Sequence, residues 1–258
     1  MKTAVIKISG KTLNEFISTE NWINIIKNLY EDYDGITIVH GGGVLITEWS
    51  NKLGLEAKFN NGQRVTTKEQ MNIVAAVQAG LINSQMTAKL NSHGINAIGL
   101  SGIDNNTFTA DYLNKDMGFV GVPKLIGSTD WIIDIMKKKN LPVFSSVCRD
   151  KNGNLMNVNA DVFTETLAAA LTTDSVFFIS DVEGVKINGN IKERLDENEI
   201  NIGIKSGDIT DGMIPKLESC IGLINQGVQK IWIGSSLINY SSKFERKING
   251  GTWIVGSN

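Results

Sequence analysis

The sequence predicts an α/β fold in which helices cover both faces of a mostly parallel β-sheet. Short apolar runs rich in β-branched residues alternate with longer segments whose apolar residues recur at i, i+3 and i+4. Runs that are apolar on both faces are typical of parallel strands buried between helices. Glycines gather where these runs end, and ligands of open parallel sheets bind at the carboxyl ends of strands.

Each expected element follows from its local pattern. Strands are expected, in chain order, at AVIKIS (4–9), ITIVH (36–40), NAIGL (96–100), LPVFSSV (141–147), SVFFIS (175–180), KIWIG (230–234) and TWIV (252–255). Helical spacing predicts helices within 13–32, 67–94, 129–140, 160–174 and 213–227, and several of these segments end in Gly or Asn, which stop helices. Another helix is expected directly after the glycines at 41–43. Residues 184–212 are the least regular part, and a soft boundary near residue 172 separates two lobes, 1–172 and 173–258.

Composition excludes several classes of function. The chain has 258 residues, of which 41% are hydrophobic, so it can bury a sizeable core. Its net charge is −2 and it has no cluster of Lys and Arg, so neither nucleic acid nor an anionic membrane is expected as a partner. Cys148 and Cys220 lie in apolar segments, which favours buried thiols in a reducing cytoplasm. The start, MKTAVIKISG, contains no stretch long enough for a signal or membrane segment, so we expect a cytoplasmic protein that acts on a small molecule.

Three consecutive glycines at 41–43 separate an expected strand from an expected helix. Bare backbone amides at a helix start favour an anion. The segment nevertheless lacks both the lysine of the phosphate-binding P-loop and the spacing of the dinucleotide fingerprint. If a phosphate binds here, its cationic partners must come from elsewhere in the chain.

Two lysines and one aspartate are candidates for binding and organising such a phosphate. Lys7 lies within an apolar strand, where its ammonium group either reaches solvent at a sheet edge or finds an anion. Lys216 lies in the first turns of a helix and opposes the helix dipole unless an anion neutralises it, the alternative being a solvated side chain. Asp161 follows the amides of NVN at a helix start, where it either caps its own helix or orients lysines.

Other polar residues suit an acidic ligand or a nucleotide. Asn157 is placed to hydrogen-bond a polar ligand, and Arg64 has the planar fork that pairs with carboxylates, although a loop arginine is usually solvated. Asp181 follows a strand in SDVEGV, either as an ordinary turn residue or as an acceptor for ribose hydroxyls. Two histidines are too few for a zinc site, and metalloprotease and serine-hydrolase motifs are absent from the sequence.

The order of these motifs resembles the amino acid kinase family. Lys7, VHGGG, NGQRVT, NVNAD, SDVEGV and DGMIPK follow one another as they do there, and the resemblance extends over residues 4–256. It implies an αβα sandwich around a mainly parallel central sheet of about eight strands. It also implies that ATP phosphorylates the γ-carboxylate of N-acetyl-L-glutamate, the second step of arginine synthesis. The lobe 1–172 would hold the acyl-glutamate and mediate dimerisation, and the lobe 173–258 would bind ATP.

The same resemblance implies roles for individual residues. Lys7 and Lys216 would stabilise the transition state, in which charge lies on the oxygens of the moving phosphoryl group, and Asp161 would organise both lysines. Gly42, Gly43, Arg64 and Asn157 would bind the substrate, and Gly10, Asp181, Val182, Glu183, Gly184, Val185, Lys186, Asp208, Ile209 and Thr210 would bind ATP. Mg²⁺ would be carried by the ATP phosphates, without ligands from the protein.

Two positions depart from the family pattern. Ser9 stands where a glycine is usual, and Gln63 replaces a commonly apolar neighbour of the arginine, so the approach of ATP and the preferred acyl group stay open. GFVG, within 101–124, is similar to the family's hairpin over the acyl-glutamate. No extra helix precedes the first strand, and in this family that pattern goes with a homodimer insensitive to arginine.

Other functions compete with this interpretation. Related kinases act on N-succinylglutamate or on a carrier-linked aminoadipate. A catalytically silent sensor with the same fold would need the pocket but not both lysines, so the presence of Lys7, Asp161 and Lys216 together argues against it. A dinucleotide-dependent oxidoreductase is disfavoured because the sequence lacks G-x-G-x-x-G.

Overall fold

The computed structural model describes the chain except residues 10, 61, 180, 211, 238–249 and 258. Its main sheet has eight strands in the order β14-β16-β15-β11-β1-β2-β8-β5. These strands are β1 (Thr3–Ile8), β2 (Gly35–His40), β5 (Ala97–Ser101), β8 (Leu141–Ser145), β11 (Ser175–Ile179), β14 (Arg194–Leu195), β15 (Lys230–Gly234) and β16 (Thr252–Val255). β15 and β16 pair antiparallel, whereas β1 with β11, β11 with β15, β2 with β8, and β5 with β8 pair parallel. The predicted α/β class with a mainly parallel sheet of about eight strands is confirmed.

The chain divides into two compact units. Unit 1 comprises Met1–Ile36 and Ala168–Asn258, and unit 2 comprises Thr37–Leu167. The first strand and the two helices after it thus belong to the same unit as the C-terminal part of the chain. The reason is that β1 pairs with β11.

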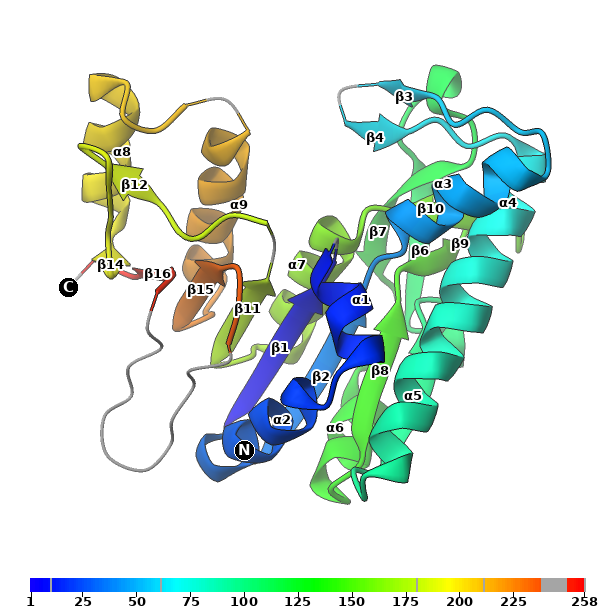
Figure 1. Ribbon diagram of the computed structural model, residues 1–258, viewed down its shortest axis with the longest axis horizontal. Coiled ribbons are helices and arrows are strands. Elements are labelled where there is room, and N and C mark those ends of the chain that lie inside the picture. Colours follow the sequence, from blue (N-terminus) through cyan, green and yellow to red (C-terminus); the bar gives the residue numbers. More distant parts are fainter. Residues whose placement is uncertain (10, 61, 180, 211, 238–249, 258) are drawn as a thin grey trace. The chain divides into compact units, whose positions relative to one another are not determined.

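Unit 1 surrounds its strands with helices and one small hairpin. These elements are α1 (Lys11–Ser18), α2 (Asn21–Asp32), α8 (Glu197–Ser206), α9 (Met213–Asn225) and the hairpin of β12 (Lys186–Ile187) with β13 (Asn190–Ile191). α2 buries Trp22, Ile26 and Leu29, as its apolar spacing predicted. α8 and α9 lie side by side (Figure 1).

Helix α8 was not predicted, because its segment was interpreted as irregular. The sequence does mark this helix. Asp196 and Glu199 form a capping box, in which each side chain accepts a hydrogen bond from the other residue's backbone N–H. Gly207, with φ of 81°, then ends the helix in the left-handed conformation that favours glycine.

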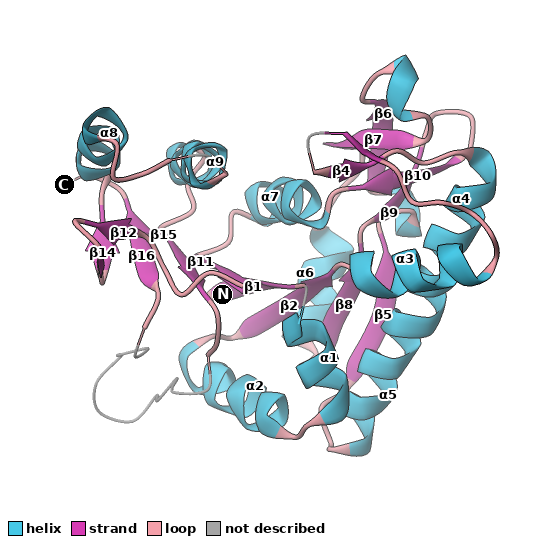
Figure 2. Cartoon of the chain, turned by 45° about the horizontal axis from the view of Figure 1, so that its top comes forward, coloured by secondary structure: helices cyan, strands magenta, loops and turns pink. Residues whose placement is uncertain are grey.

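Unit 2 contains β5, β8 and most of β2 from the main sheet, together with a second sheet and several helices. Its helices are α3 (Gly43–Lys52), α4 (Lys68–Val74), η1 (Ala75–Ile82), α5 (Asn83–Ser92), the short η2 (Asp104–Asn106) and η3 (Lys115–Met117), α6 (Asp130–Lys137) and most of α7 (Ala160–Leu171). The second sheet has the order β6 (Phe108–Tyr112), β7 (Val120–Leu125), β10 (Leu155–Val158) and β9 (Val147–Arg149). Figure 2 shows this sheet beside α4. β3 (Phe59–Asn60) and β4 (Gln63–Arg64) form a hairpin.

Two segments of unit 2 differ from the predicted elements. The run 141–147, predicted as one strand, is divided between β8 and β9, because the chain turns at Ser146 and β9 pairs with β10. The predicted helix 67–94 is continuous in Figure 1, but its middle part, η1, is a π-helix. It begins with a capping box of Thr67 and Gln70 and ends before Gly94, which has φ of 75°.

Candidate functional site

The glycine loop, residues 41–43, connects β2 to α3. Gly42 has φ of −170°, an extended conformation open to any residue, so packing is what requires glycine there. A Cβ atom at Gly42 would lie 2.9 Å from Ile82 Cδ1, whereas a Cβ at Gly43 would meet nothing within 4 Å. No side chain of the described residues caps α3. The loop therefore packs tightly on one side and is open at Gly43, at a helix start suited to an anion.

Arg64, in β4, braces this loop. Its Nη2 donates to the carbonyl oxygen of Gly43 at 3.0 Å and to Thr47 Oγ1 at 2.5 Å. Its guanidinium carbon lies 4.8 Å from the centre of the Phe59 ring. The side chain is 8% exposed, and burial lowers the pKa of the guanidinium. Its Nη1 is buried with no hydrogen-bond partner among the described residues, a costly arrangement for a cationic donor.

Asn157, in β10, is connected to Arg64 through Thr66. Asn157 Nδ2 donates to Thr66 Oγ1 at 2.9 Å, and Thr66 Oγ1 donates to the carbonyl oxygen of Arg64 at 3.1 Å. The backbone N–H of Asn157 donates to the carbonyl oxygen of Phe119 in the GFVG segment, which leads into β7, the second strand of the antiparallel β6–β7 pair. Unit 2 thus brings together all four residues predicted to bind the substrate: Gly42, Gly43, Arg64 and Asn157.

Asp161 lies in the first turn of α7. Its backbone N–H donates to Asn159 Oδ1 at 2.8 Å, so Asn159 satisfies an amide of the first turn. The alternative in which Asp161 is needed to cap its own helix is therefore disfavoured, and its side chain is half-buried in the first turn of α7.

Lys7 and Lys216 are both related to Phe178 in unit 1, Lys7 by strand register and Lys216 by contact with the ring. Lys7 is 5% exposed on an inner strand, so the edge-strand alternative is wrong, and its Nζ donates to Ser9 Oγ at 2.7 Å. In the register of β1 with β11, Lys7 is opposite Phe178, so their side chains share one face of the sheet. Lys216 extends from α9 and places its Nζ 5.5 Å from the centre of the Phe178 ring. Strand register and this contact therefore bring both predicted lysines to one face.

The segment after β11 forms the first part of the predicted ATP site. Asp181, Val182 and Glu183 are exposed. Gly184 has φ of 146°, and a Cβ there would lie 2.8 Å from Ile191 Cγ2, so this position requires glycine. Lys186 forms an exposed ion pair with Glu183 at 3.6 Å.

The second part of the predicted ATP site follows α8. Asp208 Oδ1 accepts from the backbone N–H of Asn188, in the turn between β12 and β13, at 3.0 Å. Thr210 is exposed. The side chains of Val185 and Ile209 are 1% and 2% exposed, and their backbone N–H groups donate to Thr252 Oγ1 and to the carbonyl oxygen of Gly203, respectively. Gly10, also predicted to bind ATP, lies outside the described residues.

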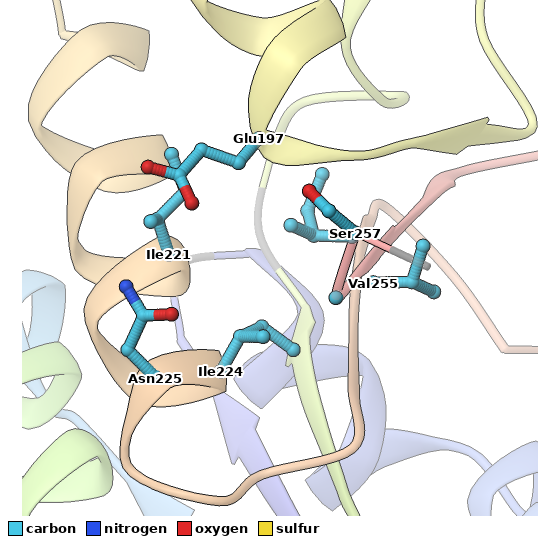
Figure 3. Close-up of a pocket in the computed structure, with 8 residues that line it drawn as sticks. Glu197, Ile221, Ile224, Asn225, Val255 and Ser257 are labelled. Carbon is cyan, nitrogen blue, oxygen red and sulfur yellow. The ribbon is translucent and has the colours of Figure 1, made fainter.

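A separate cavity of about 300 Å³ lies in unit 1 between α8, α9 and the C-terminal segment. Figure 3 shows Ile221, Ile224 and Asn225 on α9 facing Val255 and Ser257, with Glu197 extending from α8. None of the predicted site residues that the structure describes lines this cavity.

Several properties of the described part of the chain bear on cofactors and location. It contains no group of three or more His, Cys, Asp or Glu side chains arranged to hold a metal ion. In the same residues, no helix combines the length and apolar character needed to cross a membrane. Cys148 and Cys220 are buried and form no disulfide with each other, as predicted.

Comparison with known proteins identifies the family to which the chain belongs. The model of the amino acid kinase family matches residues 2–235. The chain belongs to the amino acid kinase family. Membership of this kinase family implies ATP as the phosphoryl donor. An acetylglutamate kinase from Staphylococcus saprophyticus is 36% identical over 99% of this chain and 100% of that protein. One from Bacillus licheniformis is 35% identical over 94% of this chain and 93% of that protein.

Solved structures extend this similarity to the amino acid kinase fold. The Streptococcus mutans protein smu.665 has a TM-score of 0.79 and 29% identity, with 98% of both chains covered. A carbamate kinase from Giardia has a TM-score of 0.68 over 99% of both chains. It is only 16% identical, so it supports the fold alone.

Sequence reasoning missed several neighbours of the site residues. Thr47 and Thr66 hydrogen-bond Arg64, and Phe178 lies under Lys216. Nothing in a single sequence distinguishes such threonines from ordinary surface residues. The position of Phe178 opposite Lys7 depends on strand register, which the apolar run does not determine by itself.

Proposed function

We propose that this chain catalyses the acetylglutamate kinase reaction, the transfer of the γ-phosphoryl group of ATP to the γ-carboxylate of N-acetyl-L-glutamate in the second step of arginine synthesis. Family membership and the near full-length curated relatives of that name support the reaction. The observation that carries it is the buried Nη1 of Arg64, a cationic donor without a partner among the described residues, next to the open glycine loop. An acidic ligand satisfies such a donor.

In this proposal unit 2 binds the acyl-glutamate. Arg64 pairs with a substrate carboxylate through Nη1, since Nη2 is occupied by Gly43 and Thr47. Asn157 binds the amide or carboxylate region of the substrate, and the amides of Gly42 and Gly43 receive the oxygens of the substrate or of the moving phosphoryl group. No general base is required, because the attacking γ-carboxylate is ionised at pH 7.

Unit 1 binds ATP and neutralises the charge of the transition state. Lys7, opposite Phe178 in the strand register, and Lys216, in contact with the Phe178 ring, supply two cations for the phosphoryl oxygens that develop charge. At roughly 4 Å and an effective dielectric near 20, each charge contact is worth about 4 kcal/mol before desolvation. Asp161 orients these lysines, the segments 181–186 and 208–210 line the nucleotide, and Mg²⁺ is carried by its phosphates.

The remaining parts of the proposal concern organisation. We propose a homodimer, which the family resemblance implies, and light scattering on the purified chain tests it. We also propose a cytoplasmic location, which two buried thiols that form no disulfide support.

The reaction is tested by ADP release from Mg·ATP with N-acetylglutamate, N-succinylglutamate or free glutamate as acceptor. Lys216→Ala should lower kcat on the order of 100-fold or more, because it removes a charge contact made in the transition state. Lys137→Ala is the matched control, since Lys137 is an exposed lysine that forms a surface ion pair with Asp134, at 3.2 Å. It should retain full activity.

Each outcome has a definite meaning. Turnover of N-acetylglutamate that fails in Lys216→Ala but persists in Lys137→Ala supports both the reaction and the role of the lysine. Faster turnover of N-succinylglutamate would reassign the acyl group. The absence of turnover with all three acceptors would contradict the proposal and favour a carrier-linked substrate or a silent sensor.

A further inference from the structure

Unit 2 contains a buried polar network beneath the glycine loop, formed by His40, Gln78, Asn83 and Ser146. Their exposures are 0%, 3%, 5% and 1%, respectively. Polar groups are costly to bury unless they are hydrogen-bonded. Four of them gathered at one place need an explanation beyond packing, because apolar residues of similar size would fill the same space at lower cost.

Gln78 connects the glycine loop to β10. Its Nε2 donates to the carbonyl oxygen of His40, the last residue of β2, at 3.1 Å and to Ser146 Oγ at 2.9 Å. Ser146 Oγ donates in turn to the carbonyl oxygen of Val158, the last residue of β10, at 2.7 Å. One amide and one hydroxyl group thus tie the strand before the glycine loop to the strand that carries Asn157.

Asn83 and His40 hold the loop from the other side. His40 Nδ1 lies 2.9 Å from the carbonyl oxygen of Gly41, which can only accept, so Nδ1 carries the proton. His40 Nε2 then accepts from Asn83 Nδ2 at 3.1 Å. Asn83 Nδ2 also donates to the carbonyl oxygen of Val143 in β8 at 2.8 Å. The imidazole is therefore fixed in one tautomer and one orientation, with Gly41 attached to it.

The π-helical segment η1 places Gln78 and Asn83 for these contacts. The backbone N–H of Asn83 bonds the carbonyl oxygen of Gln78, an i→i+5 bond between the two residues whose side chains hold the loop. In an α-helix, residues five apart point about 140° away from each other, whereas a π-turn aligns them. π-Turns are frequent at functional sites, and this one lies directly beneath a candidate site.

Two glycines make room for this arrangement. A Cβ atom at Gly99 in β5 would lie 2.2 Å from Asn83 Oδ1. A Cβ at Gly42 would lie 2.9 Å from Ile82 Cδ1 and 3.5 Å from Gln78 Cγ. The glycine loop is therefore in direct contact with the π-helical segment, and any shift of that segment would move the loop.

We propose that Gln78, Asn83 and Ser146 are positioning residues, which fix the glycine loop and the end of β10 in one arrangement, and that η1 is π-helical in order to align Gln78 with Asn83. This inference rests on the proposed function, in which the amides of Gly42 and Gly43 and the side chain of Asn157 meet the substrate. Misplacement of a reacting group by about 1 Å can cost on the order of 100-fold in rate. A network that holds both groups therefore acts on catalysis without touching the substrate.

The test compares Gln78→Met with Thr107→Val in the full-length protein. Methionine has nearly the length of glutamine but cannot form either hydrogen bond. Thr107 is 0% exposed and accepts a hydrogen bond from Trp131 Nε1 at 2.7 Å, so its replacement also removes a buried bond of unit 2. kcat and KM for both substrates are measured well below the melting temperature, together with hydrogen exchange of the amides in residues 38–48.

Gln78→Met should lower kcat/KM for N-acetylglutamate by about 10- to 100-fold, with KM for ATP within about twofold of wild type. Amides 38–48 should exchange faster than in wild type. Ser146→Ala should also lower kcat/KM for N-acetylglutamate. The double variant Asn83→Leu/Gln78→Met should lower kcat/KM by less than the product of the two single reductions, because Asn83 and Gln78 hold the same loop. Thr107→Val should lower only the melting temperature.

The inference is overturned if Gln78→Met behaves like Thr107→Val, with a lower melting temperature but unchanged kcat/KM and loop exchange. Failure of the proposed function looks different, since the wild-type protein itself would not turn over N-acetylglutamate. Hydrogen exchange then decides alone: faster exchange of residues 38–48 in Gln78→Met than in Thr107→Val supports the positioning role, and equal exchange contradicts it.

Discussion

The burial of His40 makes the stability of the protein depend on pH in a definite window. Burial lowers the pKa of the imidazole from 6.5 to about 4, against the opposing effect of its bond to Gly41. Below pH 6.5 the unfolded chain takes up a proton at this residue that the folded chain refuses until about pH 4. The contribution of His40 to folding stability is thus fully present above pH 6.5 and is lost as the pH falls from 6.5 to about 4.

The size of this effect follows from the two pKa values. One pKa unit corresponds to about 1.4 kcal/mol, so the difference between 6.5 and about 4 is worth on the order of 3 kcal/mol. That is a large share of the roughly 5–15 kcal/mol that stabilises a typical domain. The folded protein should therefore lose stability steeply in mild acid.

Urea denaturation at a series of pH values between 7 and 4 measures the effect. Carboxylates titrate in the same range, so the comparison is with His40→Gln, whose neutral side chain can still accept from Asn83. Between pH 7 and 4 the wild-type protein should lose about 3 kcal/mol more unfolding free energy than this variant. His93→Gln, which removes the other imidazole of the chain, is the matched control.

Parallel pH profiles for wild type and His40→Gln would refute the reasoning. They would mean that the folded protein protonates His40 as readily as the unfolded chain does. The hydrogen bond from Asn83 Nδ2 to His40 Nε2 would then be broken at neutral to mildly acidic pH, and the fixed tautomer inferred from the structure would be wrong.

Three further predictions address the site itself. Gly42→Ala should lower the melting temperature, measured by thermal unfolding, by several degrees, because the added Cβ would meet Ile82. Gly43→Ala should leave the melting temperature unchanged and raise KM for N-acetylglutamate, measured by steady-state kinetics, about tenfold. Phe178→Leu should lower kcat by about three- to thirtyfold through loss of the cation–π contact, and it should have no further effect in a Lys216→Ala background. Arg64→Lys should raise KM for N-acetylglutamate by about tenfold or more without changing KM for ATP, because lysine cannot serve Gly43 and a carboxylate through one planar fork.

The sequence predicted the strands of the main sheet well where apolar runs were long. Seven of its strands lie within about two residues of the predicted runs, because a strand buried on both faces leaves a continuous apolar signal. β14, with only Arg194 and Leu195, leaves no such signal and was missed. Similarly, the pattern of 67–94 predicted a helix but not its π-helical middle, since one extra residue in a turn barely changes apolar spacing.

The candidate site was only partly accessible from the sequence. Arg64 and Asn157 were predicted from residue type and family motif. Their connection through Thr66 was not, because it depends on a hydrogen bond between Asn157 and Thr66, which lie 91 positions apart in the sequence. The network of His40, Gln78 and Asn83 was not foreseen. When a helix is predicted from the spacing of its apolar residues, its polar residues are assigned to the solvent-facing side. Buried polar residues such as Gln78 and Asn83 are therefore not recognised until their hydrogen-bond partners are known.

The pairing of β1 with β11 imposes an order on folding. Ala4 pairs with Ser175, so β1 must wait for about 170 more residues before this partner is synthesised. At roughly 5–20 residues per second this delay is about 10–30 s, whereas unit 2 is one continuous segment whose synthesis is complete before β11 is made. During that interval the apolar strand would be prone to aggregate, and a charge within it acts as a gatekeeper. Lys7, buried in the finished protein, would thus protect the nascent chain before it serves the folded one.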